Sequence, residues 1–149
     1  MDWRVLVIFL ASVTVAAATG SLFSPSDWYA SLNRAPWTPP GWVFPVVWTT
    51  LYVLMAIAAA RVANLPGAGI ALALFALQIA LNTLWTPVFF GAHRVGAGLA
   101  IICGLWLAVA FMLVAFWRLD RLAGALIAPY LAWLTIAASL NLWIWRFNP

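Results

Sequence analysis

The sequence has very little charge. Only 7% of its 149 residues are charged, it contains no lysine, and its only acidic residues are Asp2, Asp27 and Asp120. A soluble globular domain usually has about a quarter charged residues, whereas this chain is 67% hydrophobic and has a mean hydropathy of +1.06. The composition therefore excludes a water-soluble globular domain and indicates a membrane protein.

The chain is also poor in residues that build metal sites and acid–base sites. Cys103 is the only cysteine, which excludes an internal disulfide, and it lies in an apolar run where we expect it to pack. His93 is the only histidine and has no second ligand-type residue near it in the sequence, so we expect no metal and no cofactor. No carboxylate pair, Ser-His-acid set or Cys-His pair is available for catalysis. The net charge of +4 comes from arginine alone, and we expect no nucleic-acid partner.

Long stretches without charge divide the chain into candidate membrane spans. A helix rises 1.5 Å per residue and needs roughly 20 residues to cross a bilayer, and each stretch is long enough for one span. The expected spans are residues 3–22, 43–60, 69–90, 95–117 and 122–145. The predicted fold class is an all-α membrane protein, a five-transmembrane-helix bundle in one domain over residues 1–149, with a long first loop. We expect a multi-pass integral membrane protein in a membrane that the sequence does not identify.

The charges at the span ends say little about topology. The first span could be mistaken for a secretory signal because small residues, Ala16-Ala17-Ala18, follow its apolar core. A cleaved signal is disfavoured because Asp2 offsets Arg4 and because the other spans need this helix for packing. The positive-inside rule leaves the orientation open, since the arginines divide four to three between the two sides: Arg4, Arg61, Arg118 and Arg121 against Arg34, Arg94 and Arg146.

The first loop is predicted to begin with a short helix. Ser24-Pro25-Ser26-Asp27 has the order of an N-cap, a proline at the first helical position and an acid at the third. The helix would carry Trp28, Tyr29 and Leu32. Asp27 is then a capping carboxylate and not a catalytic group.

The same loop ends in a stretch crowded with aromatic rings, residues 37–48. Pro39 and Pro40 fix the backbone φ angle and stiffen the approach, and Pro45 is tolerated because it falls in the first turn of the following helix. We expect a rigid aromatic lid. For Trp42 alone, an anchor at the membrane interface is the competing interpretation.

Amide side chains inside the spans are costly in lipid and therefore informative. On the third span two amides and two rings form one helical stripe, and on the fifth span two rings, a small residue and an amide form another. Their members are Gln78, Asn82, Trp85 and Phe89, and Tyr130, Trp133, Ala137 and Asn141. For Gln78, a bond between helices and contact with a ligand are equally favoured. Pro87 and Pro129 interrupt the same two spans and are expected to kink them.

The residues of these stripes are expected at similar depths in the membrane. Alternating spans put the first loop, the third loop and the C-terminus on one side of the membrane. At 1.5 Å per residue, Trp48 lies about 8 Å below that side, Asn82 and Ala137 about 12 Å, Tyr52 about 14 Å and Trp133 about 18 Å. All fall in one leaflet beneath the aromatic loop. The sequence therefore predicts an apolar, aromatic pocket suited to a flat hydrophobic ligand.

Five motifs in order make the chain resemble the TspO/MBR family, the tryptophan-rich sensory proteins and translocator proteins, also called peripheral-type benzodiazepine receptors. The resemblance covers nearly the whole chain. The motifs are Trp28-Tyr29 with Leu32, Trp37-x-Pro39-Pro40-x-Trp42, Trp48 with Tyr52, Asn82-x-x-Trp85-x-Pro87-x-Phe89-Phe90, and Pro129-Tyr130-Leu131-x-Trp133 leading to Leu140-Asn141.

The resemblance implies a membrane protein, often a homodimer, that binds porphyrins such as protoporphyrin IX, sterols, and isoquinoline or benzodiazepine-type drugs. The bacterial relatives are linked to tetrapyrrole-dependent regulation. The ligand-binding positions that it implies are Trp37, Phe44, Trp48, Tyr52, Asn82, Phe89, Trp133 and Ala137.

The leading functional hypothesis is a binding protein or sensor for porphyrins. The alternatives are a light- and oxygen-dependent porphyrin-degrading activity, for which Trp48 and Trp133 are the candidate catalytic residues, and transport of porphyrin or sterol. We expect no conventional enzyme.

Two features depart from the family pattern. Arg34-Ala35-Pro36-Trp37 shifts by one residue a proline that usually follows the basic residue directly, which alters the shape of the lid. The C-terminal segment from Leu140 to Arg146 lacks the tyrosine to which sterol recognition is often assigned. Sterol binding is therefore the least supported expectation.

Overall fold

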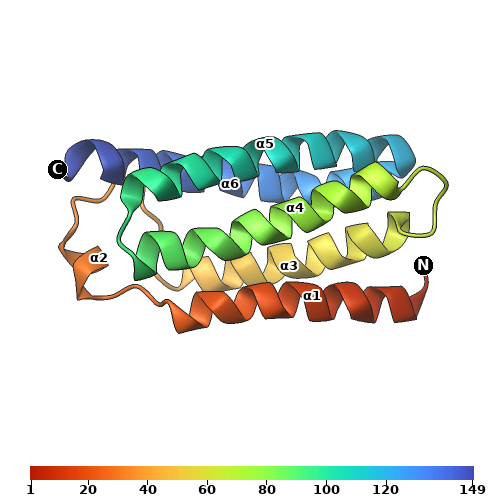
Figure 1. Ribbon diagram of the computed structural model, residues 1–149, viewed down its shortest axis with the longest axis horizontal. Helices are drawn as coiled ribbons and strands as arrows, with labels where there is room; N and C mark the ends of the chain where they lie inside the picture. The colour runs from red at the N-terminus through yellow and green to blue at the C-terminus, as the bar shows by residue number, and fades with distance from the viewer.

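The computed structural model describes residues 1–149 and consists of helices without strands (Figure 1). The elements are α1 (Trp3–Leu22), α2 (Asp27–Ser31), α3 (Val43–Val62), α4 (Gly69–Thr86), the π-helical turn η1 (Pro87–Gly91), α5 (Val95–Leu119) and α6 (Arg121–Phe147). With α4 and η1 taken as one helix, five helices are long and apolar enough to cross a membrane. The predicted all-α fold with five spans and a short helix in the first loop is confirmed. The chain is a multi-pass integral membrane protein.

Three of the spans run past the ends that the charges predicted. α3 continues to Val62, α5 to Leu119 and α6 to Phe147, so each carries an arginine in its last turn. A cation near a helix C-terminus interacts favourably with the helix dipole and the last carbonyl groups. The first arginine after an apolar run therefore belongs to the helix and does not mark its end.

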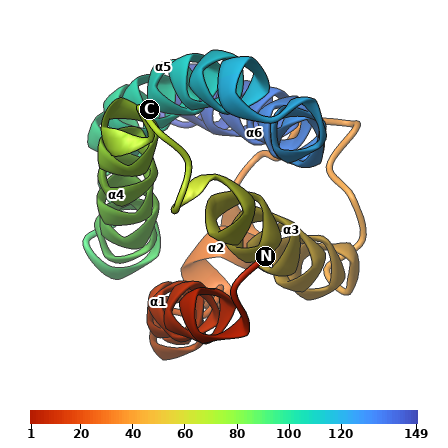
Figure 2. The same ribbon diagram turned by 90° about the vertical axis from the view of Figure 1, so that its right-hand side faces the viewer.

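The spans form a closed ring when the bundle is viewed along its length (Figure 2). Going round, α1 packs on α3, α3 on α6, α6 on α5, α5 on α4, and α4 returns to α1. The most extensive contacts are those of α5 with α6 and with α4, as the short connections between these helices predicted. α1 contributes least to the interior, with only Val13 and Ala16 buried.

The solid core fills the half of the bundle that contains the α3–α4 turn. Its fully buried residues include Met55 and Val62 of α3, Met112 and Phe116 of α5, and Ile127 of α6. The same end holds an ion pair in which Arg61 Nη2 lies 2.6 Å from Asp120 Oδ2. The other half of the bundle, below the first loop, is packed less completely and contains the cavity described below.

The helix in the first loop begins later than predicted. Its N-cap is Ser26, whose side chain makes no capping hydrogen bond, and Asp27 is the first helical residue and not the third. The prediction that Ser24 caps this helix is wrong, because its hydroxyl donates to the Ser21 carbonyl at the end of α1, at 3.2 Å. Ser24 thus extends the end of α1, and α2 is left with five residues.

The loop after α2 is fastened to the end of α6. The Asn33 backbone N–H donates to Asn148 Oδ1 at 2.7 Å, and Asn148 Nδ2 donates to the Asn33 carbonyl at 3.0 Å. The indole N–H of Trp143 donates to Asn33 Oδ1 at 3.3 Å. These bonds hold the first loop over the end of the bundle, beside the C-terminus (Figure 1).

Candidate functional site

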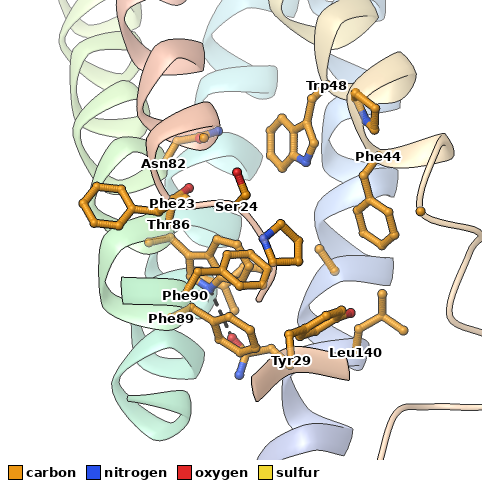
Figure 3. A pocket seen from close by; sticks show the side chains of 18 of the residues that line it. Phe23, Ser24, Tyr29, Phe44, Trp48, Asn82, Thr86, Phe89, Phe90 and Leu140 are labelled. Carbon is orange, nitrogen blue, oxygen red and sulfur yellow. Dashed lines mark hydrogen bonds between the residues drawn. The ribbon is translucent and has the colours of Figure 1, made fainter. Parts of the chain in front are cut away.

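A cavity of about 810 Å³ opens inside the bundle below the first loop. All five spans and the first loop supply residues to its lining, and most of the lining is apolar. Phe44 and Trp48 of α3 lie on one side of it, and Asn82 and Phe90 of α4 and η1 lie on the other (Figure 3). Tyr29 of α2 and Leu140 of α6 lie at the end nearer the loop.

Aromatic rings form much of the cavity wall. On α3, the Trp48 and Tyr52 ring centroids are 5.6 Å apart, and the Phe44 ring meets Trp133 of α6 edge-on at 5.6 Å. On the opposite wall, Trp85 stacks on Phe89 with centroids 4.8 Å apart and planes at 17°. Since ring faces pair favourably with other π systems, these walls suit a flat, aromatic molecule.

A chain of hydrogen bonds runs from the cavity wall into the core. Tyr52 Oη donates to Asn82 Oδ1 at 3.0 Å, Asn82 Nδ2 donates to Tyr130 Oη at 2.7 Å, and Tyr130 Oη donates to Gln78 Oε1 at 2.9 Å. Tyr52 and Asn82 line the cavity, while Gln78 and Tyr130 are fully buried behind it. Gln78 therefore joins α4 to α6. Of its two interpretations, the structure favours the bond between helices.

Asn82 keeps unused hydrogen-bonding capacity. An amide oxygen accepts two bonds and an amide nitrogen donates two, and each atom of Asn82 uses one. The side chain is 6% exposed, at the cavity wall. One further donor and one further acceptor are thus present in an otherwise apolar region.

Asn141 positions one cavity wall. Its Oδ1 accepts from the Trp85 indole N–H at 3.1 Å, and its Nδ2 donates to the Val95 carbonyl at 3.1 Å. Gly98 of α5 lies so close that a Cβ there would be 3.1 Å from the Phe89 ring and 3.3 Å from Asn141 Oδ1. Asn141 bonds to Trp85, and Gly98, which has no side chain, leaves room for the Phe89 ring. Together they position the Trp85–Phe89 stack.

Charge is confined to the loop end of the cavity, where Asp27 and Arg34 are the charged lining residues. The Arg34 guanidinium lies 5.5 Å from the centroid of the Tyr29 ring. Burial raises the pKa of the Tyr29 hydroxyl, and the Arg34 charge opposes this shift. No group of three or more His, Cys, Asp or Glu side chains is placed to hold a metal ion.

The chain is similar to known proteins over almost its whole length. Residues 5–146 match the sequence profile of the TspO/MBR family. The chain is 51% identical to the tryptophan-rich sensory protein of Cereibacter sphaeroides, over 99% of this chain and 94% of that one. It is 46% identical to protein CrtK of Rhodobacter capsulatus, over 100% and 96% of the two chains, and 36% identical to the translocator protein of Homo sapiens, over 98% and 91%.

This chain belongs to the TspO/MBR family. The membership that the five motifs predicted is therefore confirmed. The relatives are named as sensory or translocator proteins and not as enzymes.

Most of the residues expected in the ligand site of this TspO/MBR protein lie on the cavity wall. They come from three spans that are distant in sequence: Phe44, Trp48, Tyr52, Asn82, Phe89, Trp133 and Ala137. Trp133 is only 8% exposed, and its indole N–H is buried without a hydrogen-bond partner.

Trp37 does not lie where it was expected. It is absent from the cavity lining, is 52% exposed, and donates from Nε1 to Ser139 Oγ at 3.1 Å. Its ring also meets the Trp143 ring edge-on at 5.2 Å. A polar partner and an aromatic partner on α6 hold this ring outside the cavity. Trp42 is 69% exposed and also lies outside the lining, and its role as an interfacial anchor stays a prediction.

The sequence did not single out several other lining residues of this TspO/MBR protein. On α6, Leu140 and Ile144 continue the stripe of Trp133 and Ala137 at helical spacing, and this signal could have identified them. α1 contributes small residues with no such signal, including Ala17 and Gly20. Arg34 was considered as a topological charge and as part of the shifted proline motif, but not as a lining residue.

Proposed function

We propose that this protein is an integral membrane binding protein, acting as a sensor, for porphyrins such as protoporphyrin IX and similar flat hydrophobic ligands. The main support is the cavity of about 810 Å³ walled by aromatic rings. Small-molecule sites usually occupy about 300–1,000 Å³ and are mostly apolar with a few placed polar groups. The cavity has both properties and lies within the membrane-spanning helices.

The polar groups beside the cavity favour a ligand that carries hydrogen-bonding atoms. Asn82 has one donor and one acceptor to spare. The unpartnered indole N–H of Trp133 is a second donor. A buried donor without a partner costs about 1–3 kcal/mol, so a ligand acceptor that reached it would gain affinity.

The names of the relatives fit this proposal. The Cereibacter sphaeroides relative is called a sensory protein, and a sensor must first bind what it detects.

The test is a titration of the purified protein with protoporphyrin IX while its tryptophan fluorescence is recorded. We expect saturable quenching in the parent and weaker binding in Trp133→Ala and Asn82→Ala. Trp3→Phe is the matched control, because Trp3 is 68% exposed at the opposite end of the bundle. Equal binding by the parent and both cavity variants would place the porphyrin site elsewhere.

A second candidate function is light-dependent porphyrin breakdown, which two indoles in the cavity wall favour. Trp48 and Trp133 both line the cavity. There an excited porphyrin would take one electron from an indole and pass it to dioxygen, which becomes superoxide. The indole radical cation would regain its electron from the porphyrin, and the resulting porphyrin radical cation would combine with superoxide, which forms the carbon–oxygen bonds that begin ring cleavage. Porphyrin loss in light and oxygen should then exceed loss in detergent alone. It should disappear in the double variant Trp48→Phe with Trp133→Phe, and breakdown that persists in this variant would exclude the mechanism.

A further inference from the structure

The two ends of the cavity differ in charge, and this difference bears on ligand choice. Asp27 and Arg34, both in the first-loop region, are the only charged lining residues. The deeper wall contains neutral polar groups, among them Tyr52, Asn82 and Asn141. A charged ligand group is costly in such an apolar interior and much cheaper at the loop end.

Arg34 is held in place by its neighbours on both sides. The backbone of Asn33 exchanges two hydrogen bonds with Asn148 of α6. On the other side Ala35 is only 5% exposed, and its carbonyl accepts bonds from the Thr38 backbone N–H at 3.0 Å and from the Thr38 hydroxyl at 2.7 Å. The backbone that carries Arg34 is therefore fixed before any ligand arrives, which lowers the entropy that binding must lose.

Arg34 also has no carboxylate partner. The ion pair of the structure joins Arg61 to Asp120 at the far end of the bundle. Asp27 lies in the first turn of α2, where a carboxylate is favoured by the helix dipole. The guanidinium of Arg34 lies beside the Tyr29 ring. It keeps donor groups for a carboxylate, which it can bind through two parallel hydrogen bonds.

We propose that Arg34 binds an acidic side group of the ligand, so that the cavity selects a flat hydrophobic acid over its neutral analogue. This inference rests on the proposed porphyrin-binding function and assigns the orientation of the ligand within it. The carboxylates lie at the loop end beside Arg34, and the macrocycle lies deeper, in the part of the cavity lined by Trp48 and Trp133. Recognition then combines apolar burial in the cavity with one charged contact at its mouth.

The test compares protoporphyrin IX, which carries two carboxylates, with its dimethyl ester, which has the same macrocycle and no charge. In the parent, the acid should bind more tightly than the ester. Arg34→Gln should raise the Kd of the acid about fivefold to tenfold, as expected for the loss of a partly solvated ion pair, and should leave the Kd of the ester unchanged. Arg34→Lys, which keeps the charge, should retain most of the preference for the acid.

Two controls separate this contact from general electrostatics. Arg94→Gln removes a cation from the same side of the membrane but outside the cavity lining, and it should leave both Kd values unchanged. Raising the salt from about 0.1 M to about 1 M shortens the Debye length from about 10 Å to about 3 Å, so it should weaken binding of the acid and not of the ester.

The possible outcomes distinguish the proposed role of Arg34 from the porphyrin-binding function on which it rests. Equal binding of acid and ester by the parent would overturn the role of Arg34 and leave porphyrin binding intact. The same holds if Arg34→Gln weakens the acid and the ester alike. Failure of the parent to bind either compound would overturn the proposed function and this inference with it.

Discussion

At the scale of single residues, Tyr130 links α6 to α4 through two hydrogen bonds of its hydroxyl group. Its hydroxyl accepts from Asn82 at 2.7 Å and donates to Gln78 at 2.9 Å, so one side chain of α6 bonds to two amides of α4. Tyr130 and Gln78 are fully buried. Because no water reaches them there, each lost bond leaves a polar atom unpaired.

Replacing Tyr130 by phenylalanine should destabilise the bundle. The change removes both bonds and leaves Gln78 Oε1 and one Asn82 donor unpaired, while the ring still fills its space. At about 0.6 kcal/mol per bond in membrane proteins, with more for stranded buried groups, we expect a loss of about 1–2 kcal/mol. Thermal unfolding in detergent measures it.

Tyr52→Phe is the matched comparison, because Tyr52 makes a single bond, to Asn82, at the cavity wall. It should cost about 0.5 kcal/mol. Equal losses of stability for the two variants would show that the buried hydrogen bonds of Tyr130 stabilise the bundle no more than the single bond of Tyr52.

The sequence located the amides and rings of the cavity wall because helical spacing puts residues on one face. It predicted that Asn82, Trp133 and Ala137 share a region, and all three line the same cavity in the structure. It could not place Trp37, because spacing in a loop does not identify the neighbour: Ser139 and Trp143 lie about a hundred residues further along the chain.

At the scale of helices, α5 and α6 pack tightly against each other at Gly124. A Cβ at this position would lie 2.7 Å from the Cα of Trp117. The neighbour is backbone, so it cannot move aside as a flexible side chain would. The tight junction between the two helices depends on a residue without a side chain.

Gly124→Ala should therefore destabilise the protein by about 1–3 kcal/mol, the usual cost of overpacking. Gly69→Ala is the control: it lies at the start of α4 with nothing within 4 Å of a new Cβ. It should be neutral or slightly stabilising, since alanine favours helix. A Gly124→Ala variant that unfolds at the parent's temperature would show that α5 and α6 can separate at no cost.

The α5–α6 junction also predicts a dependence of stability on pH. The backbone N–H of Ala123 is the largest of the contacts that hold the pKa of Asp120 below its usual range, and the Arg61 guanidinium adds to it. A carboxylate whose folded pKa is lowered contributes stability above its unfolded pKa, and this stability is lost as the pH falls through the folded pKa. The unfolding temperature should thus fall below about pH 4.

Asp120→Asn isolates the charge, because asparagine caps a helix about as well as aspartate but cannot pair with Arg61. The variant should be less stable than the parent at pH 7, and the difference should shrink towards pH 3. If the variant and the parent are equally stable over this whole range, the role of Asp120 is capping alone.

The spans were predictable because lipid demands about 20 apolar residues per helix, and the observed helices contain them. The errors concern helix ends, where polar contacts between side chains determine the boundary. The second span was expected to end at residue 60, but α3 continues through Arg61, which pairs with Asp120. Ser24 was assigned to the cap of α2 and bonds back to α1. Local patterns show that a residue can cap a helix, and its contacts determine which helix it caps.

At the scale of the whole molecule, the cavity results from uneven packing of the ring. The core half is filled by α3, α5 and α6, while α1 buries only Val13 and Ala16 and leaves space below the loop. The sequence indicated a pocket there, but it could not give its volume, because the volume depends on how all five helices meet. The first loop covers this space and is anchored to α6.

This arrangement predicts that the anchor of the loop controls ligand exchange. Asn148→Ala removes three hydrogen bonds, two to the backbone of Asn33 and one to the Ile144 carbonyl. The loop should then open more often, and protoporphyrin IX should dissociate several-fold faster in a stopped-flow experiment. Amide hydrogen exchange in residues 32–38 should rise, because local opening exposes the backbone.

Asn64→Ala provides the control, since Asn64 lies in the turn between α3 and α4, at the far end of the bundle. It should change neither the dissociation rate nor the exchange of residues 32–38. If Asn148→Ala accelerates amide exchange but not porphyrin release, the ligand leaves by a route between the spans and not through the loop. Unchanged exchange would show that Trp37 and Trp143 hold the loop without the asparagine pair, because their contacts with Ser139 and Asn33 remain in the variant.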